Sequence, residues 1–296
     1  MRDGLHRNGV QLVEKHMRLL IVGDVHGNAE FLRSYIYPLA LTVGAGAIIQ
    51  LGDFGAWEHT SAGIGFLDEV GQLAQKTAVP LYWLHGNHDK HSETLGRYEP
   101  DERGFYPCRP FVFYIPQGHA WQIGGVRLRS FGGAYSVDKQ YRLKLERARQ
   151  QPESLWFPEE EMTEAQMVAM LKADNSAKDI ILSHDKPLSS RPRWNRKAFA
   201  ECIPNQLRLE QALRVHRPAY WFHGHLHTHY VDVVRGRNWT TTVVGLAPDW
   251  DAAEHGYRQV HSWSIVDCEN GKADVRLGQE TFTDPEILQK HIMALN

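Results

Sequence analysis

The chain has 296 residues, of which 42% are hydrophobic, and a formal net charge of −2. This composition is typical of a globular protein with a sizeable core. The charge balance argues against a strong nucleic-acid signature, and no apolar run approaches the ~20 residues that a transmembrane helix needs. Three cysteines without paired spacing favour a reducing compartment, and residues 1–16 lack the apolar segment of a signal peptide. We therefore expect a cytoplasmic protein that does not associate with membranes.

Strand and helix patterns alternate along the first third of the chain. Residues 1–16 are expected to form a flexible extension, and residues 17–296 a single domain. Asn28 can cap a helix that follows the first apolar run, and a second helix is expected over residues 64–76. With apolar runs on either side, this βαβαβ pattern predicts a parallel sheet.

The rest of the chain mixes strands, helices and polar loops. Strands expected at 111–115 and 126–130 would be joined by a turn near Gly124-Gly125, and Thr163 with Gln166 predicts a capping box. The remaining expected elements are a helix around Leu209–Leu213, antiparallel strands at 230–234, 240–244, 263–266 and 273–277, and a C-terminal helix around Ile287–Ile292.

Five short polar motifs each follow an apolar run, where a strand is expected to end. They are Asp24-Val25-His26, Gly52-Asp53, Gly86-Asn87-His88-Asp89, Ser183-His184 and Gly224-His225-Leu226-His227. Residues at the carboxyl ends of such strands share one rim of a sheet, where α/β folds bind ligands. The motifs offer carboxylate, imidazole and amide groups without a thiolate. This donor set predicts two divalent metal ions per chain, manganese first, with iron, zinc, cobalt or nickel as alternatives.

Each motif taken alone has a simpler explanation. An isolated Asp is more often a strand-end cap, and His59, His85 and His223 fit structural or surface positions. His225 and His227 alternate along one segment, so an extended backbone would direct both side chains the same way. The ordered set of five motifs, each after an apolar run, is what indicates a metal centre.

The pattern D-x-H, GD, GNHD, SH and GHxH resembles the calcineurin-like metallophosphoesterase superfamily over residues 23–227. The resemblance implies an α/β fold in which two mixed β-sheets form a sandwich flanked by helices. It implies that Asp24, His26 and His227 hold a first metal ion. A second ion would be held by Asn87, His184 and His225, with Asp53 as the bridging ligand and a hydroxide shared by both ions as the nucleophile.

The resemblance also implies catalytic roles for two residues of the third motif. His88 would hydrogen-bond the scissile phosphate and protonate the leaving oxygen, and Asp89 would orient the His88 ring.

Two departures from the protein-phosphatase branch favour diesters as substrates. That branch has GDxVDRG and GNHE, whereas this chain has Gly52-Asp53-Phe54-Gly55-Ala56-Trp57 without an arginine, and its third motif ends in Asp89. Two divalent ions, two aspartates and a hydroxide leave a formal charge of about +1, which a phosphodiester monoanion would balance. We therefore expect a phosphodiesterase that acts on 2′,3′-cyclic nucleotides or other small nucleotide diesters.

Two polar segments are candidates for substrate binding, because the loops at a strand rim determine specificity. Each offers cations and an aromatic side chain for a phosphate and a nucleobase, although solvated loops have the same composition. The candidate residues are Tyr135, Lys139, Arg142, Arg191, Arg193, Trp194 and Arg196.

Three other functions remain open from the sequence. A phosphomonoesterase or protein phosphatase would use the same fold. A non-catalytic interaction scaffold is a rival of another class, although such relatives lack ligand residues and every ligand position is filled here. A DNA-repair nuclease would be expected to carry a basic track, which the sequence does not show.

Overall fold

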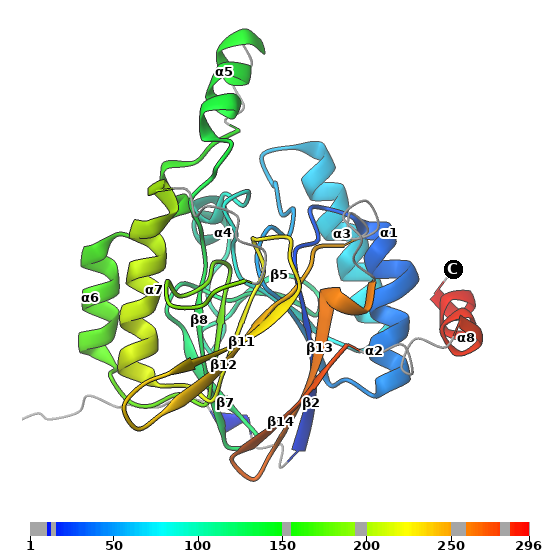
Figure 1. The fold of residues 1–296 in the computed structure, drawn as a ribbon. Coiled ribbons are helices and arrows are strands. Elements are labelled where there is room, and N and C mark those ends of the chain that lie inside the picture. Colours follow the sequence, from blue (N-terminus) through cyan, green and yellow to red (C-terminus); the bar gives the residue numbers. More distant parts are fainter. Residues whose placement is uncertain are drawn as a thin grey trace, which may run out of the picture.

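Two facing β-sheets form the centre of the molecule, and helices cover both outer faces (Figure 1). The computed structural model describes residues 11–12, 16–149, 155–192, 200–249, 259–278 and 285–295. Each sheet has seven strands and mixes parallel with antiparallel pairs. The predicted sandwich of two mixed sheets flanked by helices is confirmed.

The first sheet has the strand order β14–β13–β2–β3–β4–β6–β5. Its strands, in that order, are Lys272–Leu277, Trp263–Glu269, His16–Val22, Ala47–Gln50, Leu81–Trp83, Val112–Tyr114 and Tyr106–Arg109. β2, β3, β4 and β6 are parallel neighbours, which confirms the parallel sheet expected from the βαβαβ pattern.

The second sheet has the order β1–β7–β8–β9–β10–β12–β11. Its strands, in that order, are Gln11–Leu12, Ala120–Ile123, Val126–Phe131, Ile180–Ser183, Tyr220–His223, Thr240–Gly245 and Tyr230–Arg235. The central strands β8, β9, β10 and β12 are parallel.

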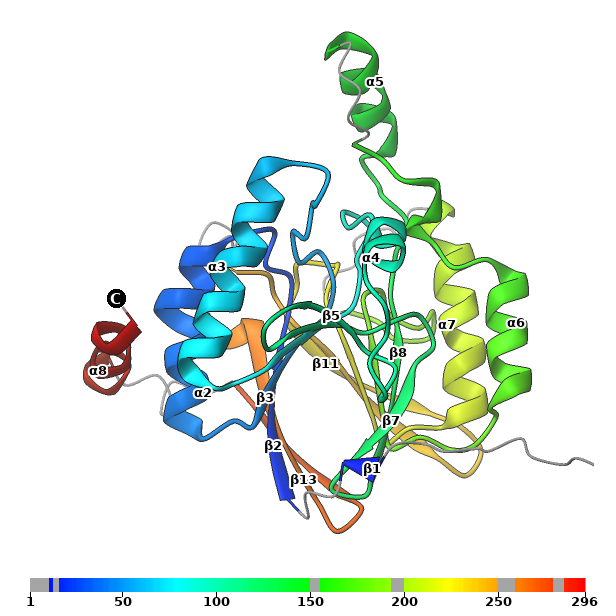
Figure 2. The same cartoon turned by 180° about the vertical axis from the view of Figure 1, so that it is seen from behind.

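Helices pack on the two outer faces, as the front and back views show (Figures 1 and 2). The first sheet is covered by α1 (Ala29–Phe31), the π-helical η1 (Leu32–Ile36), α2 (Tyr37–Val43) and α3 (Ser61–Thr77), with α8 (Pro285–Leu295) beside α2. The second sheet is covered by α6 (Glu164–Ala173) and α7 (Ile203–His216). Short elements are α4 (His91–Arg97), η2 (Pro158–Glu160), η3 (Ala200–Cys202) and η5 (Gln259–Ser262).

One helix, α5 (Lys139–Arg149), projects away from the body above the strand ends (Figures 1 and 2). The sequence pattern predicts no helix in this polar segment. Its position matters for function because it leaves the body at the rim where the motifs lie.

The apolar strands are buried on both faces because each sheet has a helix layer on one side and the other sheet on the other. Along β2, Leu20 and Val22 enter the core beneath the helices, whereas Leu19 and Ile21 enter the core between the sheets. This two-sided burial explains why the strands read as continuous apolar runs. The motif residues that follow are thereby anchored to strands that are buried on both faces.

Two expectations about the strands differ from the structure. The hairpin predicted over 111–130 is wrong, since β6 lies beside β4 in the first sheet and β8 pairs with β7 across the Gly124-Gly125 turn. The chain therefore changes sheets between β6 and β7. Within the segment expected to be flexible, Gln11–Leu12 pair with β7, and His16 begins β2.

The three cysteines are buried and free. In the described part of the chain, no helix has the length and apolar character needed to cross a membrane.

The capping box at the start of α6 gives a test of the fold. Thr163 accepts a hydrogen bond from the Gln166 backbone, and the Gln166 side chain accepts one from the Thr163 backbone. We expect Thr163→Ala to lower the free energy of unfolding by about 1 kcal/mol, because an N-cap acceptor is lost. Urea unfolding followed by circular dichroism measures this, and Thr163→Ser, which keeps the hydroxyl, is the matched control. Equal stability of the two variants would show that the cap contributes nothing.

Candidate metal centre

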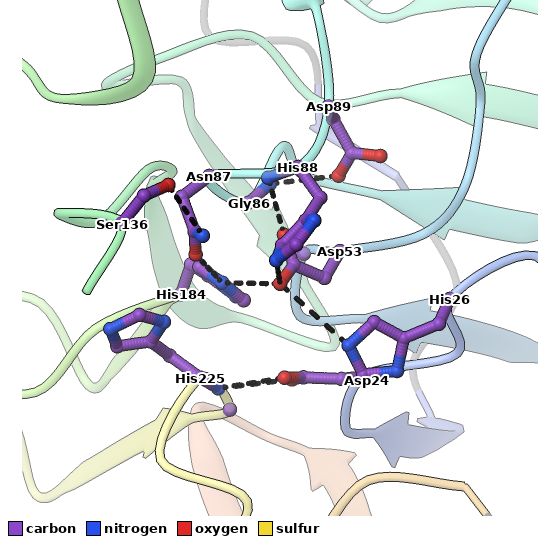
Figure 3. A network of polar contacts seen from close by, with 12 residues as sticks. Asp24, His26, Asp53, Gly86, Asn87, His88, Asp89, Ser136, His184 and His225 are labelled. Carbon is purple, nitrogen blue, oxygen red and sulfur yellow. Dashed lines mark hydrogen bonds and ion pairs between the residues drawn. The ribbon is translucent and has the colours of Figure 1, made fainter. Parts of the chain in front are cut away.

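The five polar motifs meet at the seam between the two sheets. Three follow β2, β3 and β4 in the first sheet, and two follow β9 and β10 in the second. The sequence pattern alone suggested the rim of one sheet. The structure instead brings together the carboxyl ends of strands from both sheets, and Figure 3 shows their side chains converging.

The backbone at this seam is strained at four of the predicted ligands. His26, Asp53, His225 and His227 have φ values of 51°, 52°, 61° and 50°. Residues other than glycine rarely adopt this left-handed conformation, and such strain concentrates at functional sites. His225 and His227 lie beyond the end of β10, so the predicted extended alternation does not hold there.

The first predicted ligand set is compact. Ligand atoms of Asp24, His26 and His227 all lie within 4.8 Å of one another. Asp24 is 1% exposed, and its Oδ2 lies 3.2 Å from His227 Nε2. The His225 backbone N–H donates to the same carboxylate at 3.0 Å, which fixes its orientation.

Asp53 lies between the two ligand sets, where a bridging carboxylate is expected. Its Oδ2 is 3.8 Å from His26 Nε2 on one side and 3.5 Å from His184 Nε2 on the other. Its Oδ1 accepts the His88 backbone N–H at 2.8 Å (Figure 3). Oδ1 is thus hydrogen-bonded to the backbone, and Oδ2 faces both predicted ligand sets.

The second set is organised around His184, which is fully buried. Its Nδ1 donates to the Leu51 carbonyl at 2.7 Å, so Nε2 faces Asn87 Oδ1 at 3.1 Å and Asp53 Oδ2. A proton on Nε2 or a metal ion between these atoms would compensate the two oxygens. Asp24, Asp53 and His184 form a second compact group, while the His225 ring centroid lies 5.0 Å from that of His184.

The electrostatics of the seam also favour a cation. Burial raises the pKa of Asp53, but the surrounding imidazoles hold it well below its ordinary value. Burial lowers the pKa of His184, yet the nearby Asp53 carboxylate outweighs this and raises it to about 10. The pKa of His26 rises against burial to about 9, because Asp249, Asp24 and Asp53 surround the ring. The buried carboxylates therefore attract positive charge, which divalent ions would supply.

Close approach of the backbone explains two of the motif glycines. A Cβ atom on Gly86 would lie 2.1 Å from Asp53 Oδ1, and one on Gly224 would lie 2.0 Å from Asp24 Oδ1. Both contacts are far shorter than any real Cβ contact. Each glycine is thus required by the carboxylate packed against it.

The predicted role of Asp89 does not hold in this structure. Its fully buried carboxylate accepts the backbone N–H groups of Phe54, Gly55 and Gly86 at 3.0, 3.0 and 2.9 Å. Asp89 therefore ties the second and third motif loops together and does not orient the His88 ring. The spacing of Asp89 and His88 in the sequence does not tell whether the carboxylate contacts the His88 ring or backbone N–H groups.

His88 is partnered by a cation from the projecting segment. The Arg142 guanidinium in α5 donates to His88 Nε2, and the ring also lies 3.8 Å from Asp53 Oδ2. The Trp57 indole N–H donates to the His88 carbonyl at 2.8 Å and so fixes its backbone. Burial lowers the pKa of His88 to about 4, with the Arg142 charge acting in the same direction.

The other predicted substrate residues are placed less directly. Lys139 rests on the Trp156 ring, with Nζ 3.8 Å from the centroid, and Tyr135 is half-buried. Arg191 is exposed, and its backbone N–H donates to Asp232. Arg193, Trp194 and Arg196 lie outside the described residues.

Several buried polar residues around the centre were not predicted from the sequence. Gln50 is fully buried and bonds to the backbone of Gly23 and Gly52 through its side-chain amide. Asp249 lies 3.8 Å from His26 Nδ1 and accepts from the Asn28 side chain at 2.7 Å. The position of Gln50 inside an apolar strand was a signal in the sequence that this residue has a special role. Asp249 is remote in sequence from every motif and carried no such signal.

Comparison with known proteins agrees with this geometry. The family model for calcineurin-like phosphoesterases matches residues 17–229. The chain belongs to this family. It is therefore a metal-dependent phosphoester hydrolase by family, and the Asp and His groups at the seam fit such a centre. A search of curated proteins finds no match.

Solved structures of similar shape are distant in sequence. A phosphopantetheinyl hydrolase from Mycobacterium tuberculosis is 14% identical, with a TM-score of 0.44 over 83% of this chain and 95% of that one. A phosphatase from Mycoplasma pneumoniae is 12% identical, with a TM-score of 0.43 over 95% and 99%. A predicted phosphoesterase from Streptococcus pneumoniae TIGR4 is 9% identical, with a TM-score of 0.33 over 89% of each chain.

The packing of Gly86 against Asp53 gives a test of the centre. We expect Gly86→Ala to displace the Asp53 carboxylate. Metal binding should then be about 10–100-fold weaker, the effect usual when the groups that orient a ligand are disturbed. Gly96→Ala is the matched control, since a Cβ atom there meets nothing within 4 Å. Calorimetric titration of the metal-stripped proteins with Mn²⁺ measures the effect. Parent-like binding by Gly86→Ala would show that Asp53 is not a ligand.

Proposed function

We propose that this protein is a dinuclear metal-dependent phosphodiesterase. The observation that supports this most directly is the position of Asp53, whose Oδ2 faces His26 on one side and His184 on the other. When bound, two divalent ions would activate water and polarise the phosphate, as in other two-metal hydrolases. Manganese is the proposed native ion, because the donor set combines carboxylate, amide and imidazole groups.

The two proposed ligand sets share the bridging aspartate. Asp24, His26 and His227 would hold the first ion, and their compact grouping supports this assignment. Asn87, His184 and His225 would hold the second. Their support is the convergence of the Asn87 and His184 donor atoms, whereas His225 would have to approach from its place beside the His184 ring.

His88 and Arg142 are proposed to act on the substrate phosphate from the open side of the centre. The guanidinium and the ring nitrogen contact each other directly, so a phosphate oxygen entering there would meet both. Arg142 would donate to that oxygen. Moving the guanidinium from the ring to the phosphate anion would favour the protonated ring, so His88 Nε2 would take up a proton from solvent and deliver it to the leaving oxygen.

The charge around Arg142 favours diesters. Arg142 Nε is 2.8 Å from Asp138 Oδ2, so this pair adds no net charge to the site. The centre with both ions then keeps a formal charge of about +1, which balances a diester monoanion. The proposed substrates are 2′,3′-cyclic nucleotides or other small nucleotide diesters.

Phosphomonoester hydrolysis is the second candidate, and Arg142 is the observation that favours it. A monoester dianion needs an additional cation, and Arg142 is already in place beside His88. The Asp138 carboxylate is paired with the guanidinium and so reduces the positive charge that Arg142 could offer to a monoester dianion. Removing that carboxylate therefore distinguishes the two candidates.

Substrate preference gives the first test of this function. With Mn²⁺ restored to the metal-stripped protein, we expect faster hydrolysis of bis-p-nitrophenyl phosphate than of p-nitrophenyl phosphate. In Asp138→Asn the unpaired Arg142 charge should shift the ratio of kcat/KM toward the monoester by about 10-fold, or about 1.4 kcal/mol of transition-state stabilisation. A parent enzyme that already prefers the monoester would establish the second candidate. Two bound ions without any hydrolysis would favour the interaction scaffold.

The role of His88 gives a separate test. We expect His88→Ala to bind metal like the parent but to lose about 10²–10⁴ in rate on a diester with a poor leaving group, the usual contribution of general acid catalysis. His59→Ala is the control, because His59 pairs with Glu93 away from the ligand sets. Unchanged turnover by His88→Ala would remove this residue from the mechanism.

A further inference from the structure

A buried chain of three polar side chains leads from the predicted ligand Asn87 to the base of the projecting segment. Asn87 Nδ2 donates to Ser136 Oγ at 3.0 Å, as Figure 3 shows, and Ser136 Oγ donates to Glu160 Oε2. The Ser136 backbone N–H donates to Glu160 Oε1 at 3.2 Å. Asn87, Ser136 and Glu160 are 3%, 0% and 1% exposed. No sequence motif includes Ser136 or Glu160.

The direction of these hydrogen bonds is fixed by the carboxylate. An ionised carboxylate only accepts, and Glu160 receives both the N–H and the O–H of Ser136. The single hydroxyl proton of Ser136 is thereby used, so its oxygen can only accept from Asn87. The Asn87 amide must then present Nδ2 to Ser136 and Oδ1 to the centre, where it lies 3.1 Å from His184 Nε2.

We propose that Ser136 and Glu160 are positioning residues that hold the Asn87 amide with its oxygen toward the second metal ion. Without this relay the amide can rotate by half a turn and present N–H groups to the ion, which do not ligate. This inference rests on the two-ion centre of the proposed function. It goes beyond that function by assigning a role to residues outside all five motifs.

The relay also links the ion site to the segment that carries Arg142. Ser136 lies just before α5 and Glu160 ends η2, so their contact closes the base of this segment. Within it, Arg142 Nη1 donates to the Leu155 carbonyl at 3.3 Å while Nη2 reaches His88. The contact between Ser136 and Glu160 therefore helps to orient the Asn87 oxygen and also to place the Arg142 guanidinium beside His88.

An isosteric substitution tests the relay. In Glu160→Gln one carboxylate oxygen becomes an NH₂ group that donates to Ser136 Oγ, so the hydroxyl proton is free to turn toward Asn87. The amide orientation is then no longer fixed. We expect the second ion to bind about 10–100-fold more weakly, the effect usual for residues behind a ligand, and the first ion to bind as in the parent.

The measurement is calorimetric titration of metal-stripped protein with Mn²⁺, with electron paramagnetic resonance to detect the spin-coupled ion pair. Ser136→Ala should act in the same direction, and Asn87→Ala shows the full loss of the second site. Ser130→Ala is the matched control, since Ser130 is equally buried and its hydroxyl donates to the Pro116 carbonyl instead. Thermal unfolding of the metal-free variants checks that each is folded.

For Glu160→Gln and Ser136→Ala, we expect weaker binding of the second ion only, together with loss of the paramagnetic resonance signal of the spin-coupled ion pair. The relay is overturned if Glu160→Gln and Ser136→Ala bind two ions like the parent while Asn87→Ala does not. A parent that binds fewer than two ions overturns the two-ion centre and the relay with it. A parent that binds two ions but hydrolyses no diester refutes the phosphodiesterase proposal alone, because the titration still decides the relay.

Discussion

Burial of two carboxylates at the seam between the sheets is the constraint on which the rest of the site depends. Asp24 and Asp53 are 1% and 2% exposed and lie in one compact group with His184. Removing charge from water is costly unless it is compensated, so the surroundings must provide donors and positive charge. The backbone N–H groups of His225 and His88 give part of that compensation. The remaining lone pairs face inward, where they attract protons or metal ions.

The two-sheet architecture makes such a burial possible. Strand ends from both sheets bring their loops to one place, and each loop supplies backbone donors to a carboxylate from another loop. Asp89 shows this most clearly, since it accepts three N–H groups from the second and third motifs. The left-handed backbone at His26, Asp53, His225 and His227 is strained, and that strain persists because the packed strands below hold the loops.

Sequence reasoning predicted the parts of this protein that depend on local pattern. Continuous apolar runs indicated the central strands, and the polar motifs after them indicated the ligand residues. What it could not predict depends on contacts between distant segments. The pairing of β8 with β7, the three backbone donors around Asp89 and the approach of Asp249 to His26 all join residues whose spacing carries no signal. The motif order indicated that a centre exists, but tertiary packing decides which atoms face it.

The polar segment between β8 and α6 illustrates this difference and bears on specificity. Its composition suggested a substrate loop, and the structure turns that loop into a helix-bearing projection whose Arg142 faces His88. In the sequence, the absence of an arginine from the second motif favours diesters. Arg142 supplies that missing cation from elsewhere, but the Asp138 carboxylate offsets it. The proposed preference for a monoanion over a dianion would therefore depend on one ion pair between the buried Arg142 and the half-exposed Asp138, which is a smaller and more easily changed difference than the motif comparison implied.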